Sequence, residues 1–171
     1  MKARAALCLA AALATSPLCQ AQLGVDADAQ LRAAFIYRFA QFTQWPADSS
    51  GMNLCMAGPG GMEEALRQLG GRLVAGQPLN FRVVDSPREA ASCQVLVLGQ
   101  SDPATLRRWL QGLGDAPVLV VGLVPEALRA GVSIALLAEP QGLAFSINHS
   151  EAKRRGLALS GQMLKLAREV R

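Results

Sequence analysis

Residues 33–46 read A-A-F-I-Y-R-F-A-Q-F-T-Q-W-P and contain five of the eight aromatic residues of this 171-residue chain. At 100° per residue, four apolar side chains of this region fall within about 80° of one another on a helix: Leu31, Phe35, Phe39 and Phe42. Ile36 and Ala40 widen this stripe. Because proline disfavours helical backbone in the residue before it, Trp45 and Pro46 are predicted to end the helix. The pattern predicts a core helix whose aromatic stripe packs on a sheet. A groove for a cofactor or a partner is the alternative.

The chain begins with the features of an export signal. Lys2 and Arg4 give a positively charged start, residues 5–14 are apolar, and Cys19-Gln20-Ala21 resembles a small-x-small cleavage site. The apolar run is shorter than the about 20 residues that a helix needs to span a bilayer. We therefore predict that residues 1–21 are a cleaved signal peptide and that the mature chain has no stable membrane span. A lipid anchor at Cys19 is the weaker alternative, because Leu18 stands where a small residue is normally required.

Cleavage after this signal lowers the formal net charge from +4 to +2 and leaves Cys55 and Cys93 as the cysteines of the mature chain. An oxidising compartment favours disulfides, so the pair predicts one bridge, and two buried free thiols are the alternative. Two thiols and a single histidine do not supply the ligand set of a metal site. The charges are mild and scattered, a pattern that does not indicate nucleic-acid binding.

Residues 22–171 have the length of one domain, in which short apolar runs alternate with helical patterns. Strands are predicted at 52–57, 79–84, 95–98, 117–121, 132–137 and 143–147. The last two form a hairpin through Glu139-Pro140-Gln141-Gly142. Helices are predicted at 62–69, at 101–113, after Asn148 and from Ser160. This order predicts an α/β fold, specifically a single-domain three-layer α/β sandwich with a mixed β-sheet and a C-terminal helix pair.

The sequence contains no convincing catalytic set. His149 stands beside Asn148 and Ser150 at a predicted helix start, where a capping or exposed role is expected. The turn Gly58-Pro59-Gly60-Gly61 follows a strand, but Glu63 occupies the third glycine position of a G-x-G-x-x-G phosphate loop. We therefore predict no enzyme activity and no cofactor, and interpret the chain as a binding protein.

The C-terminal 25 residues combine an apolar stripe with basic side chains. Ser160 is predicted to cap a helix whose apolar stripe has four members: Met163, Leu166, Ala167 and Val170. The basic residues of this region cluster near helix ends, where cations suit the negative pole: Lys153, Arg154, Arg155, Lys165, Arg168 and Arg171. A solvated surface explains them most simply. A basic face that steers an acidic partner or a membrane surface is the alternative.

The aromatic stretch at 33–46 and the pattern I-N-x-x-x-A-x-x-x-G-L-x-L-S-x-x-x-L-K-L-A-R-E-V at 147–170 together resemble the YfiR family of small exported proteins. The segments L-C-M-A-G and S-C-Q-V-L-V-L-G also match, so the resemblance covers residues 30–171. It implies a periplasmic protein with an α/β sandwich fold. The family's best-known member restrains an inner-membrane diguanylate cyclase of the YfiN type by binding its periplasmic domain, and it tends to dimerise.

Carried over residue by residue, the resemblance implies a Cys55–Cys93 disulfide and a structural role for Trp45-Pro46. It also implies that some residues near the C-terminal helices face a partner, and the basic pair beside them is predicted to help. These candidates are Asn148, Arg154, Arg155, Gly156 and Leu157. The chain departs from the family in lacking a second cysteine pair after Cys93, and in having Gly161 and Gln162 where the family often repeats serine.

Two hypotheses about function follow. The first is an exported regulatory protein that binds the periplasmic domain of an inner-membrane sensor and thereby lowers cyclic-di-GMP synthesis, with a homodimer as a further possibility. The second is a periplasmic small-ligand-binding protein that serves a transport or sensing system. Its pocket would lie where ligands usually bind in α/β folds, at the strand ends near residues 58–61 or 99–102.

Overall fold

The computed structural model describes residues 18–46, 51–140 and 142–171, with side chains described from residue 27 onward. Residues 1–17 of the predicted signal peptide lie outside the described residues. Residues 18–21 belong to the start of helix α1, which runs from Leu18 to Gln41. Among the described helices, none combines the length and the apolar character that a bilayer crossing requires.

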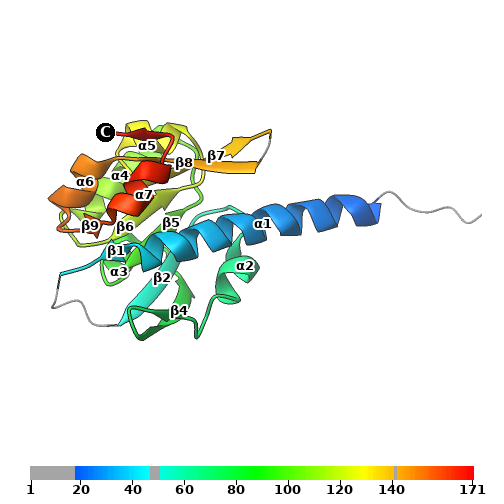
Figure 1. Ribbon diagram of the computed structural model, residues 1–171, viewed down its shortest axis with the longest axis horizontal. Coiled ribbons are helices and arrows are strands. Elements are labelled where there is room, and N and C mark those ends of the chain that lie inside the picture. The colour runs from blue at the N-terminus through cyan, green and yellow to red at the C-terminus, as the bar shows by residue number, and fades with distance from the viewer. Residues whose placement is uncertain (1–17, 47–50, 141) are drawn as a thin grey trace, which may run out of the picture.

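An eight-stranded mixed sheet forms the middle of the molecule, with the strand order β10-β8-β7-β6-β5-β2-β4-β3 (Figure 1). Its strands have these bounds: β2 Met52–Ala57, β3 Leu73–Val74, β4 Gln77–Val83, β5 Val95–Leu98, β6 Leu119–Gly122, β7 Ile134–Glu139, β8 Gly142–Ile147 and β10 Glu169–Val170. The five central strands, from β4 to β7 across the sheet, are parallel, whereas β8 is antiparallel to β7. The chain passes from β2 to β4 on one side and then to β5 on the other, so β2 and β5 flank the topological switch point.

Helices cover both faces of this sheet. On one face α1, α2 (Glu63–Arg67) and α7 (Gly161–Leu166) pack over strand residues such as Leu54 and Val97. On the other face α3 (Pro87–Ala90), α4 (Pro103–Leu113) and α5 (Glu126–Ala130) pack over residues such as Leu96 and Val120. Successive residues of the central strands enter opposite cores, which is why β5 and β6 are buried along their whole length and have no polar side chain. The predicted three-layer α/β sandwich is confirmed.

Helix α1 ends four residues earlier than predicted. It stops at Gln41, and residues Thr43–Gln44 form strand β1, which pairs antiparallel with β9 (Ala158–Leu159). The hydroxyl of Thr43 donates a 2.7 Å hydrogen bond to the carbonyl of Phe39 and closes the last turn. The prediction that Trp45-Pro46 ends the helix is therefore wrong. The chain leaves the helix before Trp45 because residues 43–44 pair with β9, which is more than 100 residues away in the sequence.

The buried face of α1 overlaps the predicted stripe only in part. Its buried side chains are mostly small: Ala29, Ala33, Ile36, Phe39 and Ala40. Leu31 is 41% exposed, and Phe35 and Phe42 are half-buried. The alanines allow the helix to approach the sheet closely, which leaves three of the four predicted stripe residues at the side of the helix. The predicted packing on the sheet is confirmed for Ile36, Phe39 and Ala40, and Phe35 and Phe42 pack against the edge of the same core. It is wrong for Leu31.

The C-terminal region contains the predicted pair of helices, α6 (His149–Arg154) and α7, but α7 is shorter than its apolar pattern suggests. After Leu166 the chain becomes extended and forms β10, which pairs parallel with β8. The backbone N–H of Arg168 donates to the carbonyl of Phe145 at 2.8 Å. Of the predicted stripe, Met163 is buried and Ala167 is half-buried, whereas Leu166 and Val170 are exposed.

The remaining differences are short elements or strand ends. Helices α3 and α5 and strand β3, each of five residues or fewer, were not predicted. The side chain of Ser86 caps α3 by accepting a bond from the N–H of Glu89 at 3.4 Å. Val83, predicted to lie on one face with Leu79 and Phe81, is exposed at the end of β4, and Val84 is buried instead.

Candidate functional site

A largely apolar groove lies between α1 and α7, which run beside each other on one face of the sheet (Figure 1). Its volume is about 490 Å³. Eight apolar side chains and two polar ones line it: Leu31, Ala34, Phe35, Phe39, Phe42, Phe145, Met163, Leu166, Arg38 and Gln162. The side of α1 that the sheet leaves uncovered thus forms one wall of the groove. The groove considered as an alternative for the aromatic stripe is present in the structure.

Three packed phenylalanine rings form part of this groove. The ring centroids of Phe39 and Phe145 are 4.9 Å apart, and the ring of Phe35 meets each of them edge-on at 6.1 Å. Such aromatic pairs add about 0.5–1.5 kcal/mol beyond the apolar area that they bury. Phe39 and Phe145 are buried while Phe35 is half-buried, so the groove has a fixed apolar floor with an accessible edge.

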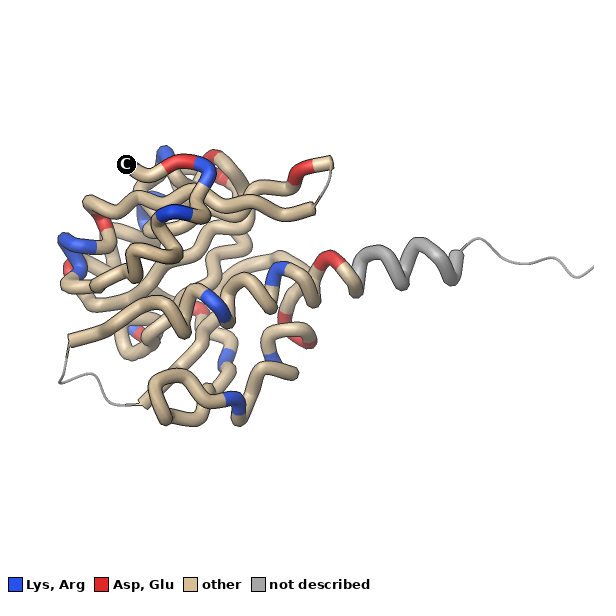
Figure 2. The backbone as a smooth tube through the Cα atoms, in the orientation of Figure 1, with Lys and Arg blue, Asp and Glu red and all other residues tan. Residues whose placement is uncertain are grey.

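The rim of the groove carries positive charge. Arg38 projects from α1 and donates a 2.9 Å hydrogen bond to the side-chain oxygen of Gln41, and Lys165 lies in the last turn of α7. Neither cation has a carboxylate within ion-pair distance in the part of the chain that the structure describes. Nearby Arg168 pairs with Glu139 at 3.2 Å. Figure 2 shows basic residues both on α1 and on the C-terminal segment beside it.

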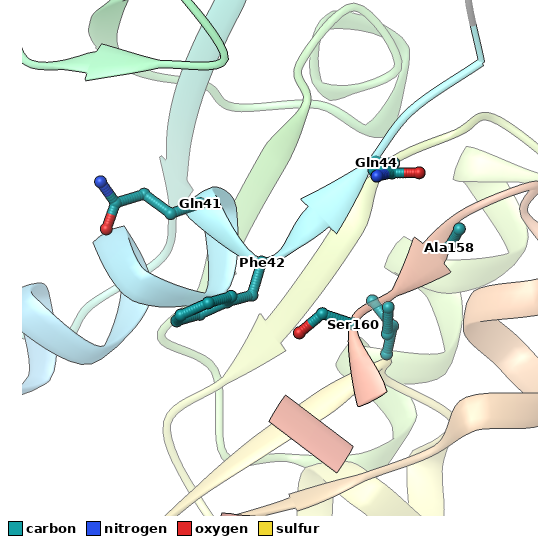
Figure 3. Close-up of a pocket in the computed structure, with 6 residues that line it drawn as sticks. Gln41, Phe42, Gln44, Ala158 and Ser160 are labelled. Carbon is teal, nitrogen blue, oxygen red and sulfur yellow. The ribbon is translucent and has the colours of Figure 1, made fainter. Parts of the chain in front are cut away.

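A second, smaller hollow of about 160 Å³ adjoins Phe42, where α1 passes into β1 (Figure 3). Gln41, Gln44 and the β9 segment from Ala158 to Ser160 complete its lining. The N–H of Ser160 donates to the carbonyl of Phe42 at 2.9 Å, and the Ser160 hydroxyl accepts from the N–H of Met163 at 3.2 Å. The predicted N-cap at Ser160 is confirmed, and through it the start of α7 is fixed against the end of α1.

The sequence profile DUF4154, described as YfiR/HmsC-like, matches residues 29–168. The matched span includes all the α1 residues that line the groove and the whole of α7. The chain belongs to the YfiR/HmsC-like family.

Two solved structures share the fold of this YfiR/HmsC-like protein. One is a conserved domain protein from Vibrio cholerae O1 biovar El Tor strain N16961, with a TM-score of 0.57 and 12% identity over 81% of this chain. The other is an ABC domain in complex with L-Trp from Streptococcus pneumoniae, with a TM-score of 0.54 and 10% identity over 84% of this chain. The present chain spans 60% of the length of each of those chains. At such low identity the likeness shows the fold alone.

The two cysteines of the YfiR/HmsC-like domain are joined. Cys55 in β2 and Cys93 just before β5 form a disulfide with their Cα atoms 6.1 Å apart, and both residues are buried. The alternative of two free thiols therefore does not hold. Arg82 on β4, which the sequence analysis did not single out, lies over the bridge. Its Nε is 3.4 Å from the sulfur of Cys55, and its Nη2 is 3.6 Å from the sulfur of Cys93.

Trp45 and Pro46 connect α1 and β1 to the rest of the domain. The indole N–H of Trp45 donates to the carbonyl of Gln94 at 3.1 Å. Gly156 has a φ of +72°, and a Cβ placed on it would lie 3.5 Å from Cγ of Pro46. These contacts support the structural role that the family resemblance implies for the Trp-Pro pair.

The five residues predicted to face a partner have different surroundings. Asn148 caps α6 by accepting from the N–H of Glu151 at 3.0 Å, while Arg154 and Gly156 are exposed. Arg155 and Leu157 are each only 2% exposed. The prediction of direct partner contact through Arg155 and Leu157 does not fit their burial, because both side chains point into the protein. The sequence alone does not show that Arg154 is exposed while Arg155 is buried.

Glu151 connects these arginines. It accepts a 2.7 Å hydrogen bond from Nε of Arg155 and a 2.8 Å bond from Nη2 of Arg154, which also pairs with Asp115. Arg155 further donates to the carbonyl of Ala116 at 3.2 Å. Burial raises the pKa of Glu151, but the bonds from the two arginines outweigh burial and hold that pKa below its ordinary value of 4.5. The cluster thus attaches α6 to the segment before β6.

The two loops proposed to hold a small ligand, at residues 58–61 and 99–102, lie against each other. A Cβ on Gly99 would lie 1.6 Å from the carbonyl oxygen of Pro59, and one on Gly58 would lie 2.2 Å from the amide nitrogen of Gln100. The two loops therefore touch directly at the switch point. His149 begins α6, and its N–H donates to the backbone carbonyl of Arg171 at 2.8 Å. No cluster of three or more His, Cys, Asp or Glu side chains suited to a metal occurs within the described ranges.

Proposed function

We propose that this protein is an exported regulatory binding protein that restrains an inner-membrane diguanylate cyclase by binding the periplasmic sensor domain of that cyclase. The observation that carries this proposal is membership of the YfiR/HmsC-like family across residues 29–168. Such a protein acts by recognising a surface and requires no bond-breaking chemistry. Its presence keeps cyclic-di-GMP synthesis low.

The groove between α1 and α7 supports this role. Protein interfaces combine a buried apolar centre with a polar rim, and aromatic residues, methionine and arginine are enriched in them. The groove has an aromatic floor, includes Met163 and carries the guanidinium of Arg38 at its edge. These are the features expected of a surface that binds another protein.

The proposal is tested by deleting the gene in its native bacterium and measuring cyclic-di-GMP by mass spectrometry. We expect the level to rise, to return to normal with the full chain, and to stay high with a chain that lacks residues 1–21. The rise should disappear when the partner cyclase is deleted as well. An unchanged level in the single deletion, or a rise that persists without the cyclase, would contradict the proposal.

A small-ligand-binding protein for transport or sensing is a second candidate function. The observation that favours it is the groove volume of about 490 Å³, which lies in the range of roughly 300–1,000 Å³ typical of ligand pockets. It is tested by thermal unfolding of the mature protein with a panel of aromatic and apolar metabolites, L-tryptophan included. A ligand that binds the folded state raises the unfolding midpoint as its concentration exceeds the dissociation constant. If no metabolite raises the midpoint, this candidate is excluded.

A further inference from the structure

Helix α1 has two apolar faces, and one of them is covered only in part. The covered face contains Ala33, Ile36 and Ala40 and packs on the sheet. The other face has a seam with spacings of four, three and four residues: Leu31, Phe35, Arg38 and Phe42, all of which line the groove. Seams with this spacing are how one helix packs along another. The open face of α1 is therefore shaped to receive a helix.

The apolar surface is larger than the cavity itself. Leu31 on α1 is 41% exposed, and Leu166 on α7 is 68% exposed, so each wall presents a solvent-accessible leucine. Contiguous exposed apolar patches of this kind mark sites of protein interaction. A small molecule seated on the phenylalanine floor would leave most of Leu166 in water. A helix lying between the two walls would cover both leucines, as in complexes where an amphipathic helix fills a groove.

The charges indicate what such a helix must carry. Arg38 lies within the seam, Lys165 is on α7 next to the lining residue Leu166, and neither has an ion-pair partner in the described part of the chain. A cation covered by an interface needs a compensating carboxylate, since an unpaired buried charge is costly. The residues that line the groove include no carboxylate, so a second copy of this chain docked groove to groove would offer Arg38 no opposite charge. The charges therefore favour an acidic partner.

We infer that the groove between α1 and α7 binds an amphipathic α-helix of the partner's periplasmic domain, with apolar side chains between the two helices and a carboxylate against Arg38. This inference rests on the proposed function, because it assigns the docking site for the cyclase. In this inference the cyclase domain contacts α1 and α7 and does not contact the cluster formed by Glu151 and Arg155.

The inference is tested with the double variant Leu31→Glu/Leu166→Glu and with Arg38→Glu. Leu73→Glu serves as the matched control, because Leu73 is 59% exposed on β3 and does not line the groove. Each full-length variant is expressed in the deletion strain, where its periplasmic amount and cyclic-di-GMP are measured. We expect both groove variants to give the high cyclic-di-GMP of the deletion and Leu73→Glu to restore the low level.

The outcomes separate this inference from the proposed function. If deletion raises cyclic-di-GMP but the groove variants restrain the cyclase as the wild type does, the inference is overturned and the proposed function stands. If deletion has no effect, the proposed function fails and the assignment of a cyclase-docking site fails with it.

A second measurement covers the case in which a charged variant does not fold. A photo-crosslinking phenylalanine analogue replaces Leu166 in one strain and Leu73 in another, and the crosslinked peptides are sequenced. We expect position 166, but not position 73, to crosslink to a cyclase peptide with heptad-spaced apolar residues and at least one carboxylate. A crosslink to a second copy of this chain, or a metabolite retained in the groove on native mass spectrometry, would overturn the inference.

Discussion

Nε of Arg155 donates a 2.7 Å hydrogen bond to the carboxylate of Glu151, although the arginine side chain has no exposed surface. The same guanidinium donates to the carbonyl of Ala116, so one buried cation joins α6 to the segment that leads into β6. Arg154, the next residue, also binds Glu151 but from the surface, with 48% of its side chain exposed. Two adjacent arginines on one carboxylate therefore have different roles.

We predict that Arg155→Met destabilises the fold by about 2 kcal/mol, because it removes the buried bonds to Glu151 and to the carbonyl of Ala116, although Glu151 keeps its bond to Arg154. Arg154→Ala should cost less than about 1 kcal/mol, as is usual for an exposed pair. Urea unfolding of both variants measures the difference. Equal losses in the two variants would contradict the assignment of the buried role to Arg155.

The lowered pKa of Glu151 predicts how stability depends on pH. Because its pKa is lower in the folded than in the unfolded protein, its bonds stabilise the fold fully above the ordinary value of 4.5. That stabilisation is lost as the pH falls through the folded pKa. We expect the free energy of unfolding to decrease below pH 4.5, and to decrease less steeply in Glu151→Gln than in the wild type. Parallel pH profiles would show that Glu151 does not contribute to the acid sensitivity.

The disulfide predicts a redox-dependent stability. Cys55 and Cys93 are separated by 38 residues, and closing a loop of this length stabilises a fold by about 4 kcal/mol in the chain-entropy model. Reductant should therefore lower the urea midpoint of the wild type. The double variant Cys55→Ser/Cys93→Ser should unfold at the lower midpoint with or without reductant. A wild-type midpoint that reductant does not change would contradict this prediction.

The parts of the fold that sequence predicted are those set by local pattern. The strands that contain Val97 and Val121 have no polar side chain, and the turn after Glu139 defines the β7–β8 hairpin. The pairing of Thr43 with Leu159 depends on contact between distant segments, so no local signal predicted the early end of α1.

The candidate site was predicted less completely. The aromatic residues of α1 were identified, but their periodicity does not show which of two adjacent faces of the helix packs on the sheet. The alanines at 29, 33 and 40 determine that, because small side chains let the helix approach closely. The 4-3-4 spacing of Leu31, Phe35, Arg38 and Phe42 was the available signal for the groove. Burial of Arg155 could not be foreseen, since it depends on how α6 packs against Ala116.

The most direct test is the affinity of the purified mature chain for the purified periplasmic domain of the cyclase, measured by calorimetry at low and high salt. The account predicts saturable binding that weakens with salt, because Arg38 and Lys165 contribute charge attraction. Leu31→Glu/Leu166→Glu should bind at least tenfold more weakly, and Leu73→Glu should bind as the wild type does. No binding to the cyclase domain under conditions in which the intact chain lowers cyclic-di-GMP in cells would contradict the account.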